Sequence, residues 1–236
     1  MPPRTAEHAR FRIDFPEAPP VDVHLLDLDA IGDPPEVAPL EDEMRRAERF
    51  HHEADGRRFL ARRGLLRGLL AERTGRDPRD LGSTPDEFGR PCIPDLEPLR
   101  FNTSRTGPWF VAALHEGTAV PGVDIESPRA LPDADSVGRR ILSDDESRSL
   151  GSDHVMEPEH LLRVWTRKEA VIKAVGRGLA IDPSSVTLPV EPGDLLEPTV
   201  VPVPVDRTSC DVWLMDLPAS RLPEGLFLSV ALAPGS

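Results

Sequence analysis

Residues 159–175 read EHLLRVWTRKEAVIKAV, a pattern typical of one long helix ended by a following glycine. At about 100° per residue, Leu162, Trp165 and Ile172 share one arc of this helix with Glu169. A carboxylate on an apolar arc is costly unless it is paired or bound to a metal ion. The stretch therefore predicts a core helix that also carries a functional acid.

Both lysines of the chain lie in this helix. Of the 28 basic residues all but Lys168 and Lys173 are Arg, and Lys differs from Arg as a compact point charge whose pKa can be shifted. Lys173 lies one turn beyond Glu169 at one edge of the arc, and Lys168 lies at the opposite edge. A Glu169–Lys173 salt bridge is the alternative interpretation, but it explains an exposed pair rather than a charged pair on an apolar face.

Upstream of the helix, residues 122–126 read GVDIE and predict a strand. Side chains alternate across a strand, so Val123 and Ile125 face the core while Asp124 and Glu126 lie side by side on the other face. Two like charges repel each other unless a cation or a solvated edge relieves them. Magnesium prefers such oxygen ligands, although an ordinary half-exposed strand is the better explanation of this segment when it is taken alone.

Three sequence blocks, in this order, resemble the surfactin-synthetase-activating type of 4′-phosphopantetheinyl transferase. They are residues 89–94 (GRPCIP) followed by residues 101–105 (FNTSR), then residues 122–126 (GVDIE), then residues 165–173 (WTRKEAVIK), with residues 55–58 (DGRR) as a weaker fourth. The match runs from about residue 45 to residue 188. Asp-x-Glu and Trp-x-x-Lys-Glu-x-x-x-Lys, about 40 residues apart, are specific in combination.

The resemblance implies an α+β fold of two halves related by a pseudo-two-fold, each with a small antiparallel sheet packed on a long helix. We expect the halves at residues 1–118 and 119–236, with coenzyme A in the cleft between them. From the residues alone we expect a helical stretch over 41–74 broken near 51–56, a loop over 84–98, and two strands, 109–114 and 119–126, joined by a turn. The other expected strands are 21–28, 199–205, 211–217 and 226–232. Because residues 199–205 contain two prolines, we expect that segment to be an edge strand or an extended loop.

The resemblance also implies roles for individual residues. Asp124, Glu126 and Glu169 would hold Mg²⁺ on the pyrophosphate, and Lys173 would contact the phosphates or the leaving group. Glu169 is our candidate general base, and whether it acts as base or only as metal ligand stays open. The nucleotide end, with its 3′-phosphate, would be held by Arg46, Arg58, Arg90, Ser104 and Arg105, the last of which replaces a histidine that the family usually has.

The implied activity is transfer of the 4′-phosphopantetheine moiety of coenzyme A to a serine of an acyl or peptidyl carrier protein, with release of adenosine 3′,5′-bisphosphate. The chain would thus be a holo-[acyl-carrier-protein] synthase type of enzyme with coenzyme A and a carrier domain as partners. A catalytically weak coenzyme A or nucleotide binder of the same fold is the alternative. A metal hydrolase built on His51, His52 and Asp55 is a third interpretation, whose spacing fits no tight zinc pattern.

Composition limits the remaining classes. The formal net charge of -13 argues against general nucleic-acid binding, and no apolar run is long enough to span a membrane. Two cysteines and no apolar leader favour a soluble, cytoplasmic protein, which we expect to be a monomer. Residues 43–79 nevertheless hold eleven Arg against six acids, an island of positive charge that suits an anionic ligand or an exposed, salt-bridged helix.

Overall fold

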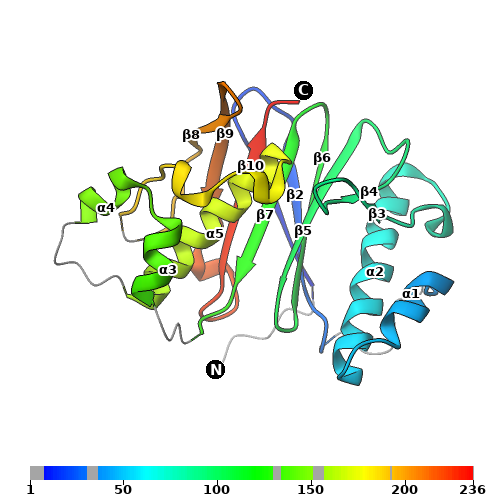
Figure 1. Ribbon diagram of the computed structural model, residues 1–236. Coiled ribbons are helices and arrows are strands. Elements are labelled where there is room, and N and C mark those ends of the chain that lie inside the picture. The colour runs from blue at the N-terminus through cyan, green and yellow to red at the C-terminus, as the bar shows by residue number, and fades with distance from the viewer. Residues whose placement is uncertain (1–7, 31–36, 130–133, 151–156, 192, 236) are drawn as a thin grey trace.

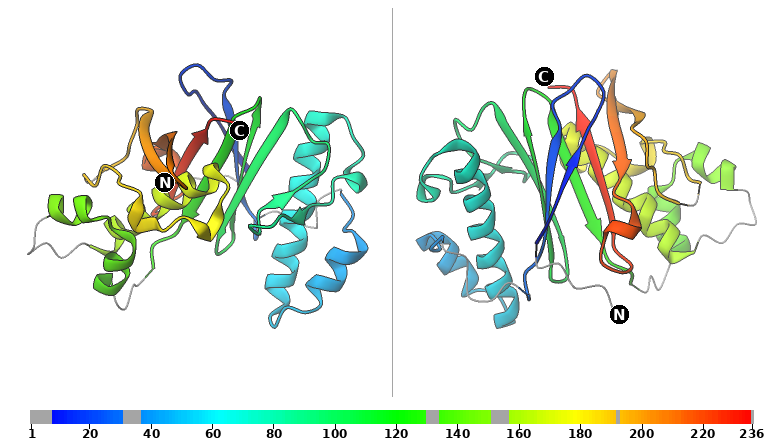
Figure 2. Two further views of the ribbon diagram at one scale, coloured as in Figure 1. Left: turned by 45° about the horizontal axis from the view of Figure 1, so that its top comes forward. Right: turned by 180° about the vertical axis from the view of Figure 1, so that it is seen from behind.

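Two four-stranded antiparallel sheets pack face to face, and a long helix covers the outer face of each (Figure 1). The computed structural model describes residues 8–30, 37–129, 134–150, 157–191 and 193–235. The two views of Figure 2 show the same succession of helix, sheet, sheet and helix from other directions. The expected α+β class, with antiparallel sheets and helices packed on them, is confirmed.

The first sheet has the strand order β1-β2-β6-β5. Its strands are β1 (His8–Ile13), β2 (Val21–Asp27), β5 (Leu99–Thr106) and β6 (Trp109–Glu116). The short helix α1 (Glu41–Ala47) and the long helix α2 (Glu53–Thr74) follow β2, and α2 ends at Gly75, whose φ of 68° suits glycine. A break within the helical stretch is confirmed, but it lies at residues 48–52, whereas residues 53–56 of the expected break already belong to α2.

The second sheet has the strand order β7-β10-β9-β8. Its strands are β7 (Val120–Glu126), β8 (Thr199–Val205), β9 (Thr208–Asp216) and β10 (Phe227–Ala233). The helices between β7 and β8 are α3 (Ala134–Ile141), α4 (Asp144–Leu150) and α5 (Pro158–Val175). The short elements of the chain are η1 (Pro78–Asp80), β3 (Thr84–Pro85), β4 (Pro91–Cys92), η2 (Gly178–Ala180), η3 (Pro183–Ser185) and η4 (Ala219–Arg221).

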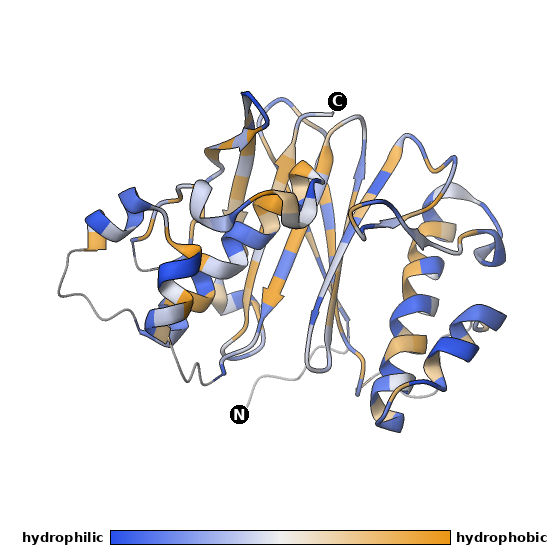
Figure 3. Cartoon of the chain, viewed as in Figure 1, coloured by the Kyte–Doolittle hydropathy of each residue, from blue (hydrophilic) through white to orange (hydrophobic). Residues whose placement is uncertain are grey.

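The core lies in three layers, because each sheet buries both of its faces. On β2, Val21, Val23 and Leu25 pack into the core between the sheets, whereas Leu26 packs under α2. Figure 3 shows the hydrophobic residues along the central strands, while α1 is mostly hydrophilic. The third layer holds α5 on the second sheet, where Ala170 and its neighbours meet Ala231.

Gly122 lets α5 approach β7 unusually closely. A Cβ atom built on Gly122 would lie 2.1 Å from the Ala170 carbonyl oxygen and 2.5 Å from the Ala174 nitrogen. Both of these are backbone atoms of α5, so no side chain can move aside to make room. The first residue of the GVDIE block therefore fixes how near the helix and its acids lie to the acids on β7.

The structure adds detail to two expectations about strands. The expected strands 109–114 and 119–126 and the turn between them are confirmed as β6 and β7, but these two strands do not pair with each other. β6 pairs with β2 and β5, whereas β7 pairs with β10. The partner of β6 is β5, whose sequence LRFNTSRT is too polar to predict a strand by hydrophobic alternation. The segment expected to be a loop over 84–98 also contains the short β3–β4 pair. The other expected strands are confirmed, with β8 at the edge of its sheet.

The two sheets share a chain path that supports the expected pseudo-repeat. In the first, β2 leads to α2 and then to the β5–β6 pair, with β6 returning beside β2. In the second, β7 leads to α5 and then to the β9–β10 pair, with β10 returning beside β7. β1 and β8 are additions at opposite edges. Among the described helices, none combines the length and the apolar run that a membrane crossing requires.

Candidate active site

A cavity of about 620 Å³ opens between the two halves. The helix α5 supplies one wall, and β5 and the turn that follows β3 supply the other. The lining includes Trp165, Glu169, Ile172 and Lys173 from α5, Asn102 and Thr103 from β5, and Phe88, Gly89, Arg90 and Pro91 from the turn. Three of the acidic and basic residues singled out in the sequence, Glu169, Lys173 and Arg90, thus line one cavity.

Asp124 lies behind this cavity in an enclosed position. Its side chain is 7% exposed, and its Oδ1 accepts hydrogen bonds from Ser104 Oγ at 2.7 Å and Lys173 Nζ at 2.6 Å. Its Oδ2 is buried and has no hydrogen-bond partner among the described residues. A buried carboxylate oxygen without a donor is costly, so this position favours an additional cationic or hydrogen-bonding ligand.

Glu126 and Glu169 share the electrostatic environment of Asp124. Burial raises the pKa of the Glu126 carboxyl, the charge of Asp124 raises it further, and Arg129 opposes both. Burial likewise raises the pKa of Glu169, Lys173 lowers it, and the charges of Asp124 and Glu126 raise it. The negative charges of the three acids therefore act on one another, and a bound cation would relieve this repulsion.

Two features of these three acids suit Mg²⁺: the oxygen ligands that they offer, and the Asp124 Oδ2 atom that has no hydrogen-bond partner among the described residues. Three carboxylates supply the hard oxygen ligands that Mg²⁺ takes, and the unpartnered Oδ2 of Asp124 is available. In the described part of the chain, however, no three His, Cys, Asp or Glu side chains are drawn together closely enough to hold an ion. This statement covers His51, His52 and Asp55 as well.

Lys173 takes the place nearest to the carboxylates. Its Nζ donates to Asp124 Oδ1 at 2.6 Å, to Ser104 Oγ at 3.1 Å and to the Val123 carbonyl at 3.3 Å. The expected alternative, a salt bridge to Glu169 along the helix, is replaced by the pair with Asp124 across two elements. The ammonium thus compensates a charge on β7 and still lines the cavity with 27% of its side chain exposed.

The arginines and Ser104 fall into separate places. Ser104 joins the Asp124 group, whereas its neighbour Arg105 points to the other face of β5, where its charge acts on Arg62 of α2. Arg90 lines the cavity while its Nε donates to Asp86 at 3.1 Å. Arg46 stacks over the Phe59 ring at 5.3 Å, on the same side as Arg62 and Arg105.

Arg58 is already neutralised. Its guanidinium donates to both carboxylate oxygens of Asp29, at 2.7 and 2.5 Å, and it lies 3.8 Å from Asp55. This fork-to-fork pair is the strong geometry for arginine, and the bond to Asp29 raises the pKa of Arg58. An anionic ligand would have to compete with Asp29 for this side chain.

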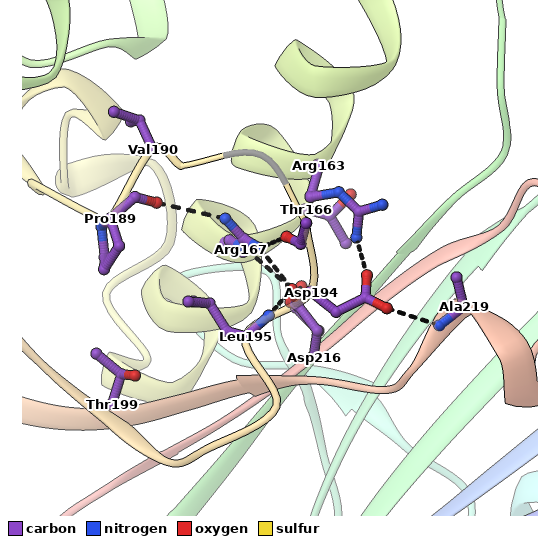
Figure 4. Close-up of polar contacts among 12 residues, drawn as sticks. Arg163, Thr166, Arg167, Pro189, Val190, Asp194, Leu195, Thr199, Asp216 and Ala219 are labelled. Atoms are coloured by element: carbon purple, nitrogen blue, oxygen red, sulfur yellow. Dashed lines mark hydrogen bonds and ion pairs between the residues drawn. The ribbon is translucent and has the colours of Figure 1, made fainter. Parts of the chain in front are cut away.

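Ion pairs outside the cavity also hold α5 in place, and the sequence did not predict their partners. Arg167 donates to Asp216 at 3.0 and 2.7 Å, and Arg163 pairs with Asp194 (Figure 4). Lys168 is completely buried and donates to Glu146 at 2.7 Å. The same Glu146 forms a capping box with Ser143: its carboxylate accepts from the Ser143 N–H at 2.6 Å, and its own N–H donates to Ser143 Oγ at 3.2 Å. Lys168 is therefore a structural lysine, unlike Lys173.

Comparisons with known proteins agree with this geometry. The family model described as the 4′-phosphopantetheinyl transferase superfamily matches residues 121–202, which include Asp124, Glu126, Glu169 and Lys173. The chain is 32% identical to 4′-phosphopantetheinyl transferase HetI of Nostoc over 160 residues, which cover 65% of this chain and 67% of that protein. The chain belongs to the 4′-phosphopantetheinyl transferase superfamily.

Other 4′-phosphopantetheinyl transferases match over a shorter span. Sfp of Bacillus subtilis is 31% identical over 137 residues, and ffp of Bacillus subtilis is 33% identical over 137 residues. Each match covers 58% of this chain and 59% of the relative. The match to the superfamily model leaves out Arg46, Arg58, Arg90, Ser104 and Arg105. Their roles as nucleotide ligands therefore stay predictions.

Sequence reasoning did not single out Arg62 or Phe59. Both lie on α2 inside the arginine-rich stretch, and Arg62 follows Arg58 by four residues. This spacing could have placed Arg62 on the same side of the helix as a predicted ligand. Its neighbour Arg105 comes from β5, more than 40 residues later in the sequence, so the grouping became visible only in the fold.

Proposed function

We propose that this chain transfers the 4′-phosphopantetheine moiety of coenzyme A to a serine of an acyl or peptidyl carrier protein, releasing adenosine 3′,5′-bisphosphate. The observation that carries the proposal is the group of Asp124, Glu126, Glu169 and Lys173, assembled from β7 and α5 beside the cavity of about 620 Å³. Membership of the 4′-phosphopantetheinyl transferase superfamily supports the choice of reaction.

In the proposed reaction the serine oxygen forms a bond to the β-phosphorus of coenzyme A, and the bond from that phosphorus to the bridging oxygen breaks. The electron pair leaves with adenosine 3′,5′-bisphosphate. Such transfers depend on positioning and charge neutralisation more than on covalent help. Lys173, whose ammonium reaches the cavity, would neutralise the departing phosphate.

Glu169 is the proposed acceptor of the serine proton, since it is the one acid of the trio that lines the cavity. Asp124, Glu126 and Glu169 would hold Mg²⁺, which when bound would stabilise negative charge on the pyrophosphate. Lys173 and Ser104 would keep the Asp124 carboxylate in a fixed orientation through their hydrogen bonds. Arg90, which shares the cavity wall, would contact the nucleotide.

The test is a mass measurement on an apo carrier protein incubated with coenzyme A, Mg²⁺ and this chain. We expect the carrier to gain the mass of one phosphopantetheine, and we expect a loss of at least about 100-fold in rate for Asp124→Asn. Asp145→Asn, an exposed change on α4, is the matched control and should keep the wild-type rate. Several unrelated carriers left unmodified by the wild-type chain would refute the transferase.

A catalytically weak binder of coenzyme A with the same fold is the second candidate. It is favoured by one observation: Lys173 already occupies Oδ1 of Asp124, and no three acids of the described chain are gathered to hold an ion. Calorimetric binding of coenzyme A together with unmodified carriers would select this candidate. Rapid carrier modification would exclude it.

A further inference from the structure

The β3–β4 hairpin belongs to neither of the two main sheets. Among the described strands, β3 pairs only with β4, so the two form a small separate sheet. On either side of the hairpin the chain is anchored in the core under α2, where Leu81, Ile93 and Leu96 are buried. The base of the hairpin is therefore fixed to the first half, while its tip, residues 86–90, reaches toward the end of α5 (Figure 1).

The tip of this hairpin is held together by its own hydrogen bonds. Asp86 Oδ1 accepts from the N–H groups of Phe88 and Arg90, both at 2.9 Å, and Asp86 Oδ2 accepts from Arg90 Nε at 3.1 Å. The Asp86 N–H donates to the Arg90 carbonyl at 2.8 Å. Because all of these bonds lie within the tip, the tip can move as one body without losing them.

The tip contacts the end of α5 across the boundary between the two halves. A Cβ atom built on Gly178 would lie 3.2 Å from the Phe88 carbonyl oxygen and 3.6 Å from Phe88 Cβ. A Cβ atom built on Gly176 would lie 2.8 Å from Arg90 Nη1. Both glycines have positive φ, 78° at Gly176 and 52° at Gly178. These two glycines therefore allow the tip to approach the backbone that follows α5.

The contact between the tip and the second half is weak. Among the described residues, no hydrogen bond or ion pair joins residues 84–92 to the second half. Arg177 lies over the Phe88 ring with its guanidinium carbon 5.9 Å from the ring centre, which is near the outer limit of a cation–π contact. A contact made without polar bonds opens at a low cost in free energy. The tip can therefore leave the end of α5 and return to it.

The tip also borders the candidate active site. Phe88 and Arg90 line the cavity of about 620 Å³ together with Glu169 and Lys173. The same two residues line a larger cavity of about 1060 Å³, whose other walls include the first residues of β5 and β7. A movement of the tip would therefore change the openings of both cavities.

We propose that the β3–β4 hairpin is a flap that controls entry to the candidate active-site cavity. The flap is hinged at its base and is closed when its tip lies against Gly176 and Gly178. The proposal rests on the proposed function, because it takes the nucleotide portion of coenzyme A as the molecule that passes the flap. A flap that closes after entry would keep water away from Glu169 and Lys173 and would delay the release of the bound molecule.

A reversible crosslink tests whether the flap must open. The distance of 3.6 Å between Phe88 Cβ and a Cβ on Gly178 suits a disulfide, so we combine Phe88→Cys and Gly178→Cys with Cys92→Ser and Cys210→Ser. Surface plasmon resonance then measures how fast adenosine 3′,5′-bisphosphate, which has no thiol to exchange with the crosslink, binds and leaves. Both rates should be at least about tenfold slower in the oxidised protein than after reduction. Equal rates in the two forms would overturn the proposal.

Thiol labelling tests the motion without any nucleotide. In the chain without its native cysteines, Gly178→Cys places a thiol under Phe88. Gly75→Cys is the matched control, because Gly75 also follows a helix, has a φ of 68° and has no neighbouring atom within 4 Å of a built Cβ. The Gly178→Cys thiol should react about tenfold or more slowly than the control thiol, yet to completion in the folded protein, because the flap opens repeatedly.

Two labelling results would overturn the flap. A Gly178→Cys thiol that reacts only when the protein unfolds would mean that the hairpin never opens, and one that reacts as fast as the control would mean that the hairpin does not cover it. The proposed function fails separately. If labelling behaves as expected while the wild type neither binds the bisphosphate nor modifies a carrier, the flap is supported and the transferase is refuted.

Discussion

Charged residues of α5 that lie within one or two turns of one another have different physical tasks. Lys168 is fully buried and satisfied by Glu146 and by the carbonyls of Pro183 and Val186 at 2.9 and 2.6 Å. Lys173 is partly exposed and bonded to Asp124. A buried ion pair mainly fixes geometry, since its desolvation offsets most of its attraction. At the residue scale, the first lysine therefore holds the helix and the second serves the site.

A buried histidine gives the stability of the fold a measurable pH dependence. His24, 4% exposed, has its pKa lowered to about 4 by burial, with the charges of His8 and Arg10 adding to the effect. Between pH 4 and the ordinary value of 6.5 the unfolded chain binds more protons at this site than the folded chain does. The free energy of unfolding should therefore fall on acidification through this window, by about 3 kcal/mol from His24 alone.

The measurement is urea denaturation of the wild type and of His24→Gln at a series of pH values. Because other groups titrate as well, the informative quantity is the difference between the two proteins. The wild type should lose more stability than the variant as the pH falls. Parallel curves would show that His24 is not the group responsible.

At the scale of elements, α5 is held at several points. Arg167 pairs with Asp216 on β9, Arg163 pairs with Asp194 and Lys168 pairs with Glu146. The backbone of α5 also meets β7 across Gly122. The acids on β7 and those on α5 belong to separate elements, so their mutual distance depends on this packing. A small shift of α5 would separate Lys173 from Asp124 and weaken the binding of any ligand that contacts both elements.

Replacing Gly122 by alanine should show this dependence. The new Cβ would overlap the backbone of Ala170 and Ala174, so we expect a loss of about 2 to 3 kcal/mol in stability together with a large fall in transfer rate. Gly138→Ala in α3 is the control, because the nearest atoms to its Cβ lie at 3.8 and 3.9 Å. That change should be neutral or stabilising. Urea denaturation and the carrier assay report both effects, and a Gly122→Ala chain of unchanged stability would contradict the close approach.

At the scale of the whole molecule, the two sheets share one core. Val23 and Val111 of the first sheet pack in the same cluster as Val123 and Val230 of the second. Neither sheet could keep this face out of water without the other. The division into residues 1–118 and 119–236 would accordingly describe chain path rather than independent folding units.

Calorimetry tests this coupling directly. We expect a single unfolding transition in which the calorimetric and van't Hoff enthalpies agree, since separating the sheets exposes the central core. The proposed ligand adenosine 3′,5′-bisphosphate should shift the whole transition upward without splitting it. Two resolved transitions would mean that the halves unfold separately.

The sequence predicted much of this architecture because strong patterns mark it. The periodicity of apolar residues predicted the α5 helix, the position of Glu169 on it and the GVDIE strand. Glycines stand at the ends of α2 and α5. The strand β5 was missed because it is polar on the side that meets the carboxylates, where Asn102 and Ser104 bond to β7. The same polarity that hides the strand makes it part of the site.

The sequence also did not predict which charged residues lie together, and the reason is different. The sequence placed Ser104 and Arg105 in one binding role, but neighbours on a strand point to opposite faces, and their partners come from distant segments. The partners of Arg58 and Lys168, which are Asp29 and Glu146, are also remote in the chain. Short-range patterns predict elements, whereas long-range pairing decides which charges remain available.

The presence of only two lysines among the 28 basic residues has a practical consequence for chemical labelling. Of the two lysine amines, one is enclosed without any exposed surface, while the other has 27% of its side chain open at the cavity. An amine-selective acylating reagent therefore distinguishes them without any engineering. Labelling of Lys173 becomes a built-in reporter of occupancy, slowed whenever a bound molecule covers the ammonium.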